Sequence, residues 1–106
     1  MNRAQAQRMY EDVSFLTQLR PFRNYENLES LAAVVNYLKE ELGLLSQGFF
    51  EQKWMAEGNE YTNLIHSYQP NKNKRLIMGA HYDVCGAQPG ADDNGSAVAG
   101  LIETIR

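Results

Sequence analysis

The run of residues 76–80, Leu-Ile-Met-Gly-Ala, most constrains the fold of this chain, because it is apolar without any polar alternation. Such a run predicts a strand that is buried on both faces, as in the centre of a sheet covered by helices. The rest of the 106 residues predicts too few elements to cover both faces. We therefore expect an α/β fold in which residues 1–106 form the first, incomplete part of one larger domain.

Two helices are predicted ahead of this strand. Residues 4–19 predict the first, because apolar side chains recur there at helical spacing and Pro21 follows. The second begins near Asn27, whose side chain suits an N-cap, and ends at Gly43, which would supply a left-handed turn.

The hydrophobic period then changes to that of strands. Residues 47–56 and 61–68 alternate loosely, and the intervening Glu-Gly-Asn-Glu at 57–60 has turn composition, so a β-hairpin is expected. Residues 95–106 predict a final helix with apolar side chains at helical spacing. The predicted order is therefore two helices, a hairpin, the buried strand and a last helix.

Composition excludes several classes of protein. Apolar residues make up 43% and charged residues 22%, which suits a globular domain, and a net charge of -3 does not favour nucleic-acid binding. No stretch is long enough to predict a membrane span, and the N-terminal residues do not resemble a signal peptide. The cellular location is left open, with the cytoplasm as the default. Cys85 is the single cysteine, so no internal disulfide forms.

Two short polar motifs follow the predicted buried strand. His81 comes at its carboxyl end, where open α/β sheets usually bind ligands, and Asp83 shares its face in extended backbone. After a loop with Gly and Pro, Asp92 and Asp93 lie at the entrance to the last helix. Imidazole and carboxylate ligands together suit zinc, and a carboxylate can bridge two ions.

Each motif also has a structural interpretation. His81 alone is more often a structural or surface histidine than a metal ligand. Asp93 and Asn94 suit helix caps, since such side chains accept the free N–H groups of a first turn. Asn94–Gly95 is also a common tight-turn dipeptide. The joint pattern is much more specific than any of its parts.

Taken together, Gly-Ala-His-Tyr-Asp at 79–83 and Pro-Gly-Ala-Asp-Asp-Asn at 89–94 resemble a known family. It is the zinc-dependent aminopeptidases of the bacterial leucyl aminopeptidase and aminopeptidase Y type, related to glutamate carboxypeptidases and glutaminyl cyclases. Residues 19–23 and 61–65 are similar to the family's first loop and to the strand before its metal strand. The resemblance implies the N-terminal portion of a mixed-sheet, three-layer zinc-exopeptidase fold.

The resemblance also implies roles for individual residues. His81 would bind one zinc ion, Asp93 would bridge two, and Asp83 would orient His81. The family often has a cis peptide bond after the bridging aspartate, which here is Asp93–Asn94. Asp92 is expected to be a carboxylate of the loop and helix entrance and not a ligand.

One departure from the family leaves the ligands intact. Gly-Ser-Ala at 95–97 stands where relatives commonly have Ala-Ser-Gly, which changes backbone freedom at the helix start. The general base, an adjacent ligand glutamate, a further aspartate and a final histidine would all lie beyond Arg106. The complete enzyme would use a zinc-activated water to hydrolyse N-terminal peptide bonds, and residues 1–106 alone are expected to be inactive.

Two other functions are kept beside the peptidase. One is a degenerate, non-enzymatic interaction domain of the same fold, and the other is acyl transfer of the glutaminyl-cyclase type. Expected partners are a peptide substrate and either a second copy of the chain or the missing C-terminal part, because the apolar run at 76–80 would lack cover. No nucleic acid partner is expected.

Overall fold

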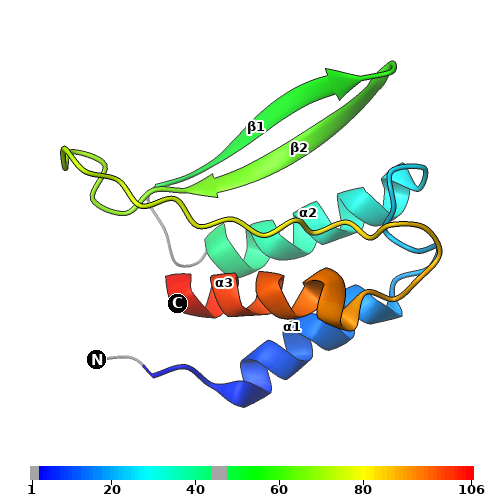
Figure 1. Cartoon of the computed structure of the whole chain (residues 1–106), viewed down its shortest axis with the longest axis horizontal. Coiled ribbons are helices and arrows are strands. Elements are labelled where there is room, and N and C mark those ends of the chain that lie inside the picture. The colour runs from blue at the N-terminus through cyan, green and yellow to red at the C-terminus, as the bar shows by residue number, and fades with distance from the viewer. Residues whose placement is uncertain (1–2, 44–47) are drawn as a thin grey trace.

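The computed structural model describes residues 3–43 and 48–106 and shows a small α/β arrangement (Figure 1). None of the helices in these two ranges combines the length and the apolar character needed to cross a bilayer. In chain order the elements are α1 (Ala6–Gln18), α2 (Leu28–Gly43), β1 (Phe49–Ala56), β2 (Asn59–His66) and α3 (Ala97–Ile105), with an irregular helical turn at Ala91–Ser96 before α3.

Both predicted N-terminal helices are confirmed. α2 begins directly after Asn27, whose side-chain amide donates a 2.7 Å hydrogen bond to the carbonyl of Phe22 and so closes the loop after α1. Gly43 is the last helical residue. The expectation of a left-handed turn there is wrong, because the helical backbone runs through this glycine and its φ lies outside the left-handed region.

The predicted β-hairpin is also present, with β1 and β2 paired along their whole length in antiparallel register. Its turn is shorter than the predicted four residues. Glu57 and Gly58 alone connect the strands, with φ values of 50° and 80°. Two positive φ values in a two-residue turn match the twist of a hairpin, and Gly58 adopts one without steric cost. The predicted start at Gln47 lies outside the described residues.

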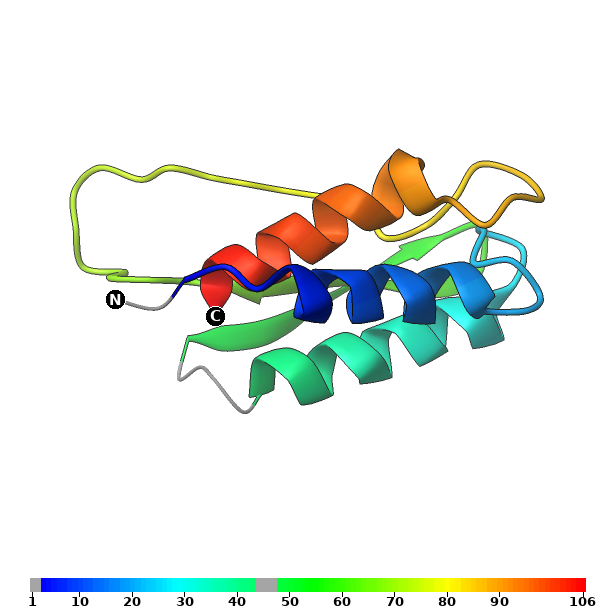
Figure 2. The ribbon, with the colours of Figure 1, turned by 90° about the horizontal axis from the view of Figure 1, so that it is seen from below.

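The hydrophobic core lies where the three helices meet. The hairpin lies on the other side of α2 and α3 from α1 (Figures 1 and 2). Phe49 of β1 and Leu64 of β2 pack against the core from that side. The buried members come from all three helices: Leu16 of α1, Val34, Leu38 and Leu42 of α2, and Val98 and Ile102 of α3.

The prediction of a buried strand at residues 76–80 is wrong for this structure. The segment pairs with no strand of the described residues, and Leu76 and Ile77 are 88% and 90% exposed. It belongs to the long irregular yellow trace that passes α3 in Figure 2. The segment forms no buried strand because the described residues place neither a neighbouring strand nor a covering layer beside it. The expectation that this run lacks cover is confirmed.

A buried ionic cluster joins α1 to α3. The Glu103 carboxylate accepts hydrogen bonds from Arg8, and Arg106 pairs with both Glu103 (3.0 Å) and Asp12 (2.9 Å). The hydroxyl of Tyr37 on α2 donates a 2.6 Å bond to Asp12. The Arg8 hydrogen bonds are the main cause that lowers the pKa of Glu103 to about 2. Burial and the Asp12 contact raise the pKa of the Tyr37 hydroxyl.

Candidate metal centre

His81 and Asp83 follow the exposed 76–80 segment and contact each other directly. Their spacing of two residues places both side chains on one face of extended backbone. His81 Nδ1 lies 3.0 Å from Asp83 Oδ1. A proton on Nδ1 donated to this carboxylate leaves the lone pair of Nε2 available for a ligand. This is the contact that the resemblance implied for Asp83.

The irregular turn Ala91–Ser96 brings Asp93 to the other ring nitrogen. Asp93 Oδ1 lies 3.2 Å from His81 Nε2. The Asp93–Asn94 peptide bond is cis, as the resemblance implied. The side-chain amide of Asn94 donates to the backbone carbonyl of His81 at 3.2 Å. The two sequence motifs are therefore joined through both side chains and backbone.

The separation of these two donor atoms suits a shared ion. Nitrogen and oxygen ligands of a tetrahedral zinc ion, each about 2.0–2.2 Å from it, lie about 3.4 Å from each other. The His81 and Asp93 side chains are 57% and 71% exposed, so an ion reaches both from solvent. Within residues 3–43 and 48–106, no set of three or more His, Cys, Asp or Glu side chains is placed to hold a metal ion. The donors present therefore fit part of a zinc site.

Gly90 shapes the backbone that leads to Asp93. Its φ of 67° is left-handed, and a Cβ there would lie 2.3 Å from Val84 Cγ1 and 2.8 Å from the Asp93 carbonyl oxygen. The Gly90 carbonyl accepts a 2.9 Å bond from the N–H of Gly95, which is itself buried. The turn consequently needs glycine at position 90 for both conformation and space.

Sequence reasoning missed the buried Arg23, which lies in the loop between α1 and α2 and is 1% exposed. Its guanidinium donates to the carbonyls of Tyr82 (2.7 Å) and Gly90 (2.9 Å), on either side of the candidate site. Burial lowers the pKa of Arg23, and the nearby charge of Asp83 opposes that shift. The one signal in the sequence was an arginine in the 19–23 loop, and its partners lie 59 and 67 residues further along the chain.

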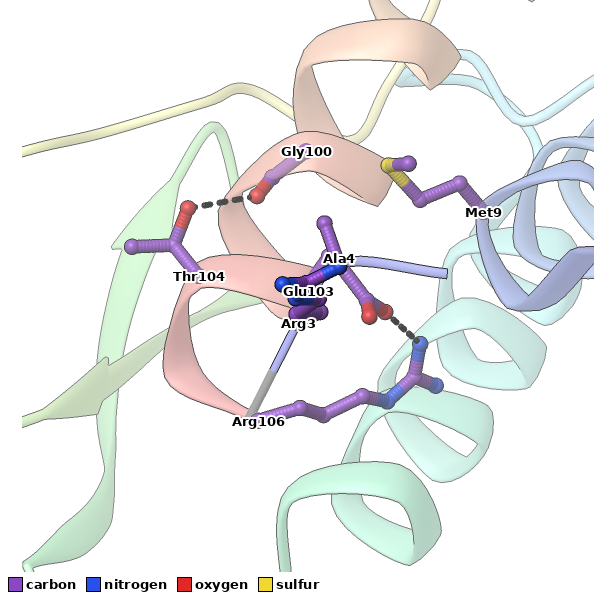
Figure 3. A pocket seen from close by; sticks show the side chains of 7 residues that line it. All are labelled: Arg3, Ala4, Met9, Gly100, Glu103, Thr104 and Arg106. Atoms are coloured by element: carbon purple, nitrogen blue, oxygen red, sulfur yellow. Dashed lines mark hydrogen bonds and ion pairs between the residues drawn. The ribbon is translucent and has the colours of Figure 1, made fainter. Parts of the chain in front are cut away.

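Asp92 and Cys85 are exposed, and the Asp92 carbonyl accepts a 2.8 Å bond from the hydroxyl of Ser96. A cavity of about 280 Å³ lies where the N-terminal segment meets α3, lined among others by Arg3 and Glu103 (Figure 3). The three candidate site residues do not line this cavity, so it is a separate feature of the surface.

Comparison with known proteins connects these motifs to a family. Residues 63–106 match Peptidase family M28, and this range contains both polar motifs. The chain is also 32% identical over 111 residues to Uncharacterized protein YfbL of Escherichia coli (strain K12). That match covers 97% of this chain and 34% of the length of YfbL. No solved structure gives a significant match.

The family match and the sequence motifs agree on the same residues. His81, Asp83 and Asp93 all fall inside the matched range, although their individual roles stay predictions. The resemblance to metal-dependent peptidases drawn from the sequence is confirmed: over residues 63–106, this chain is similar to the peptidases of family M28.

Proposed function

We propose that this chain is the N-terminal part of the catalytic domain of a zinc-dependent aminopeptidase. The single observation that carries the proposal is the 3.2 Å approach of His81 Nε2 to Asp93 Oδ1. These atoms come from two separate motifs, and both motifs lie inside the range similar to family M28. The substrate class is a peptide with a free N-terminus, whose first peptide bond is hydrolysed.

Each residue of the centre has a distinct task in this proposal. His81 would bind zinc through Nε2, and Asp93 would bind zinc through its carboxylate. Bound zinc supplies a water of lowered pKa and polarises the scissile carbonyl. Asp83 would accept a hydrogen bond from the Nδ1–H group of His81 and so keep the ring in the tautomer that leaves Nε2 free. The glutamate that moves the proton lies, by the resemblance, beyond Arg106.

The proposed fold extends past the described elements. The chain spans 34% of the length of YfbL, so most of such a domain would come from other residues. We infer that residues 76–80 join a mixed sheet between two helical layers in the complete domain, which would cover the exposed Leu76 and Ile77. Residues 1–106 would then be one part of a three-layer zinc-exopeptidase domain.

The test is aminopeptidase activity of the natural gene product that contains this chain. We expect zinc-dependent hydrolysis of a leucyl amide, and loss of that hydrolysis in His81→Ala and in Asp93→Asn. Asp92→Asn is the matched control, because it removes a neighbouring exposed carboxylate that approaches neither nitrogen of His81. Bound zinc, measured by elemental analysis, should fall in the two site variants and stay level in the control.

Two results would replace this proposal with its alternatives. Cyclisation of a glutaminyl peptide without hydrolysis of the leucyl amide would favour acyl transfer of the glutaminyl-cyclase type. A folded gene product that binds no zinc and shows neither reaction would indicate a non-enzymatic interaction domain of the same fold.

A further inference from the structure

The guanidinium of Arg23 is a buried charge whose hydrogen-bond partners, among residues 3–43 and 48–106, are all backbone carbonyls. It leaves the loop after α1, is 1% exposed, and uses three nitrogens to reach four backbone carbonyls. A buried charge costs free energy unless hydrogen bonds compensate it, and these carbonyl dipoles supply that compensation. The acceptors are the carbonyls of Leu16 (3.0 Å), Tyr82 (2.7 Å), Pro89 (2.5 Å) and Gly90 (2.9 Å).

These four acceptors come from the two halves of the candidate centre and from the core. The Tyr82 carbonyl lies between His81 and Asp83, so it belongs to the backbone that carries the first motif. Residues 89 and 90, whose carbonyls are acceptors, directly precede the turn that contains Asp93. The Leu16 carbonyl belongs to α1, whose Leu16 side chain lies in the core. The Arg23 side chain thus links the backbone of both motifs to α1.

The backbone of Arg23 adds a bond of its own. Its carbonyl accepts a 3.0 Å bond from the N–H of Val84, directly after the first motif. Nη2 would also lie 3.0 Å from any Cβ placed on Gly90, so the second motif packs closely on the guanidinium. Lysine has one nitrogen and cannot reproduce the planar fork that serves several acceptors at once.

We propose that Arg23 is a positioning residue of the candidate metal centre, which sets the approach of His81 Nε2 to Asp93 Oδ1 by holding the backbone of both motifs. The part of this inference that concerns the metal rests on the proposed function. The part that concerns the backbone does not, because hydrogen bonds to four carbonyls exist without any ion. The experiment therefore measures the effect of Arg23 on the backbone and its effect on metal binding separately.

The test compares Arg23→Lys and Arg23→Gln with the matched controls Arg20→Lys and Arg20→Gln, all in the natural gene product. Arg20 lies in the same loop, but its side chain is exposed and donates to the nearby backbone carbonyls of Thr17 and Leu19. Far-UV circular dichroism and thermal melting establish which variants are folded.

The metal-free readout is amide hydrogen exchange at Val84 and Gly95, whose N–H groups report the two held segments. We expect exchange at both amides to accelerate at least about tenfold in the Arg23 variants and to change less than about twofold in the Arg20 variants. Folded Arg23→Lys protein with exchange as slow as wild type would overturn the proposal.

The metal readout is the affinity for Co²⁺ and the visible absorption of the saturated Co²⁺ complex. Groups that orient metal ligands typically change affinity by about 10–100-fold when removed. We expect such a loss in folded Arg23→Lys together with an altered absorption spectrum, which a purely stabilising residue would not produce. Wild-type affinity and spectrum in that variant overturn the role of Arg23 and leave the proposed peptidase intact. A wild-type protein that binds no Co²⁺ contradicts the peptidase, and hydrogen exchange then decides the backbone role alone.

If the Arg23 variants do not fold, the test uses NMR of the wild-type protein. A change in the ring resonances of His81 then reports zinc binding. We expect zinc to shift the Arg23 Nε–H resonance and to leave that of Arg20 in place. A zinc-induced change at His81 with no shift at Arg23 would refute the inference.

Discussion

Asp83 and Asp92 are carboxylates of neighbouring loops with different surroundings. Asp83 lies 3.0 Å from His81 Nδ1, whereas the Asp92 side chain is exposed. A carboxylate on one ring nitrogen fixes the tautomer and strengthens the other nitrogen as a ligand. The structure therefore distinguishes a carboxylate that contacts the histidine from one that lies only near the motif.

We predict that Asp83→Asn weakens zinc binding by about 10–100-fold, because a neutral amide accepts a weaker hydrogen bond from His81 Nδ1–H and no longer fixes the tautomer. Isothermal titration calorimetry with zinc measures the change. Asp92→Asn should bind zinc within about twofold of wild type. Equal losses in both variants would show that only the overall negative charge of the loops matters.

Gly90 and Gly86 form a second matched pair, since both have left-handed φ values, 67° and 71°. A Cβ at Gly86 meets nothing within 4 Å, whereas one at Gly90 meets Val84 Cγ1 at 2.3 Å. We predict that Gly86→Ala costs about 1–2 kcal/mol of stability, the cost of the backbone conformation alone. Gly90→Ala should cost about 1–3 kcal/mol more, because it also crowds the core side of the turn. Urea unfolding measures both, and equal costs would contradict the steric argument.

At the scale of elements, α1 and α3 are joined by charges as well as by apolar contacts. Glu103 of α3 has a side chain only 3% exposed and contacts Arg8 of α1. Its pKa is lowered to about 2, chiefly by those Arg8 hydrogen bonds. The folded chain thus keeps Glu103 ionised at a pH where the unfolded chain has already bound a proton.

This shift predicts acid destabilisation. Between about pH 4.5 and pH 2 the unfolded state binds more protons than the folded state at Glu103, so its contribution to stability is lost as the pH falls. Above pH 4.5 that contribution is fully present. Thermal melting of wild type and Glu103→Gln should therefore differ most at neutral pH and converge near pH 2. Glu11→Gln, which removes an exposed carboxylate of α1, should follow the wild type throughout.

Local elements were predictable from residue patterns, whereas long-range contacts were not, apart from the approach of His81 to Asp93, which the family resemblance implied. The two helices and the hairpin follow from spacing and turn residues such as Gly58, which act within a few positions. The contact of His81 with Asp83 follows from strand alternation. The carbonyl partners of Arg23 lie up to 67 residues away, and no periodicity encodes them. The apolar run at 76–80 was correctly expected to lack cover, but the predicted strand is absent because the described residues supply no strand for it to pair with.

At the scale of the whole molecule, residues 76–78 form a contiguous run of exposed apolar side chains. Leu76 and Ile77 are almost completely exposed, and Met78 is 57% exposed. Contiguous apolar side chains on a surface mark sites of association. Under the proposed function, other parts of a larger domain would cover them.

We predict that residues 1–106 alone self-associate through this segment. Size-exclusion chromatography with light scattering should show species larger than the 12.1 kDa monomer at micromolar concentration. Ile77→Lys should shift the distribution toward monomer, because it places a charge in the association surface. Asn73→Lys, a matched control outside the apolar run, should not. A monomeric wild-type chain that melts cooperatively in dilute solution would contradict this prediction.

The hydrogen bonds of Arg23 have a practical consequence for protein engineering. Grafting the stretch from His81 to Asp93 onto another scaffold would transfer the two polar motifs without Arg23, whose guanidinium holds the backbone of both. The smallest transplantable unit therefore also includes the end of the first helix and the loop that follows it. A designer who copies the two motifs alone obtains the proposed ligands without the arginine that hydrogen-bonds to their backbone.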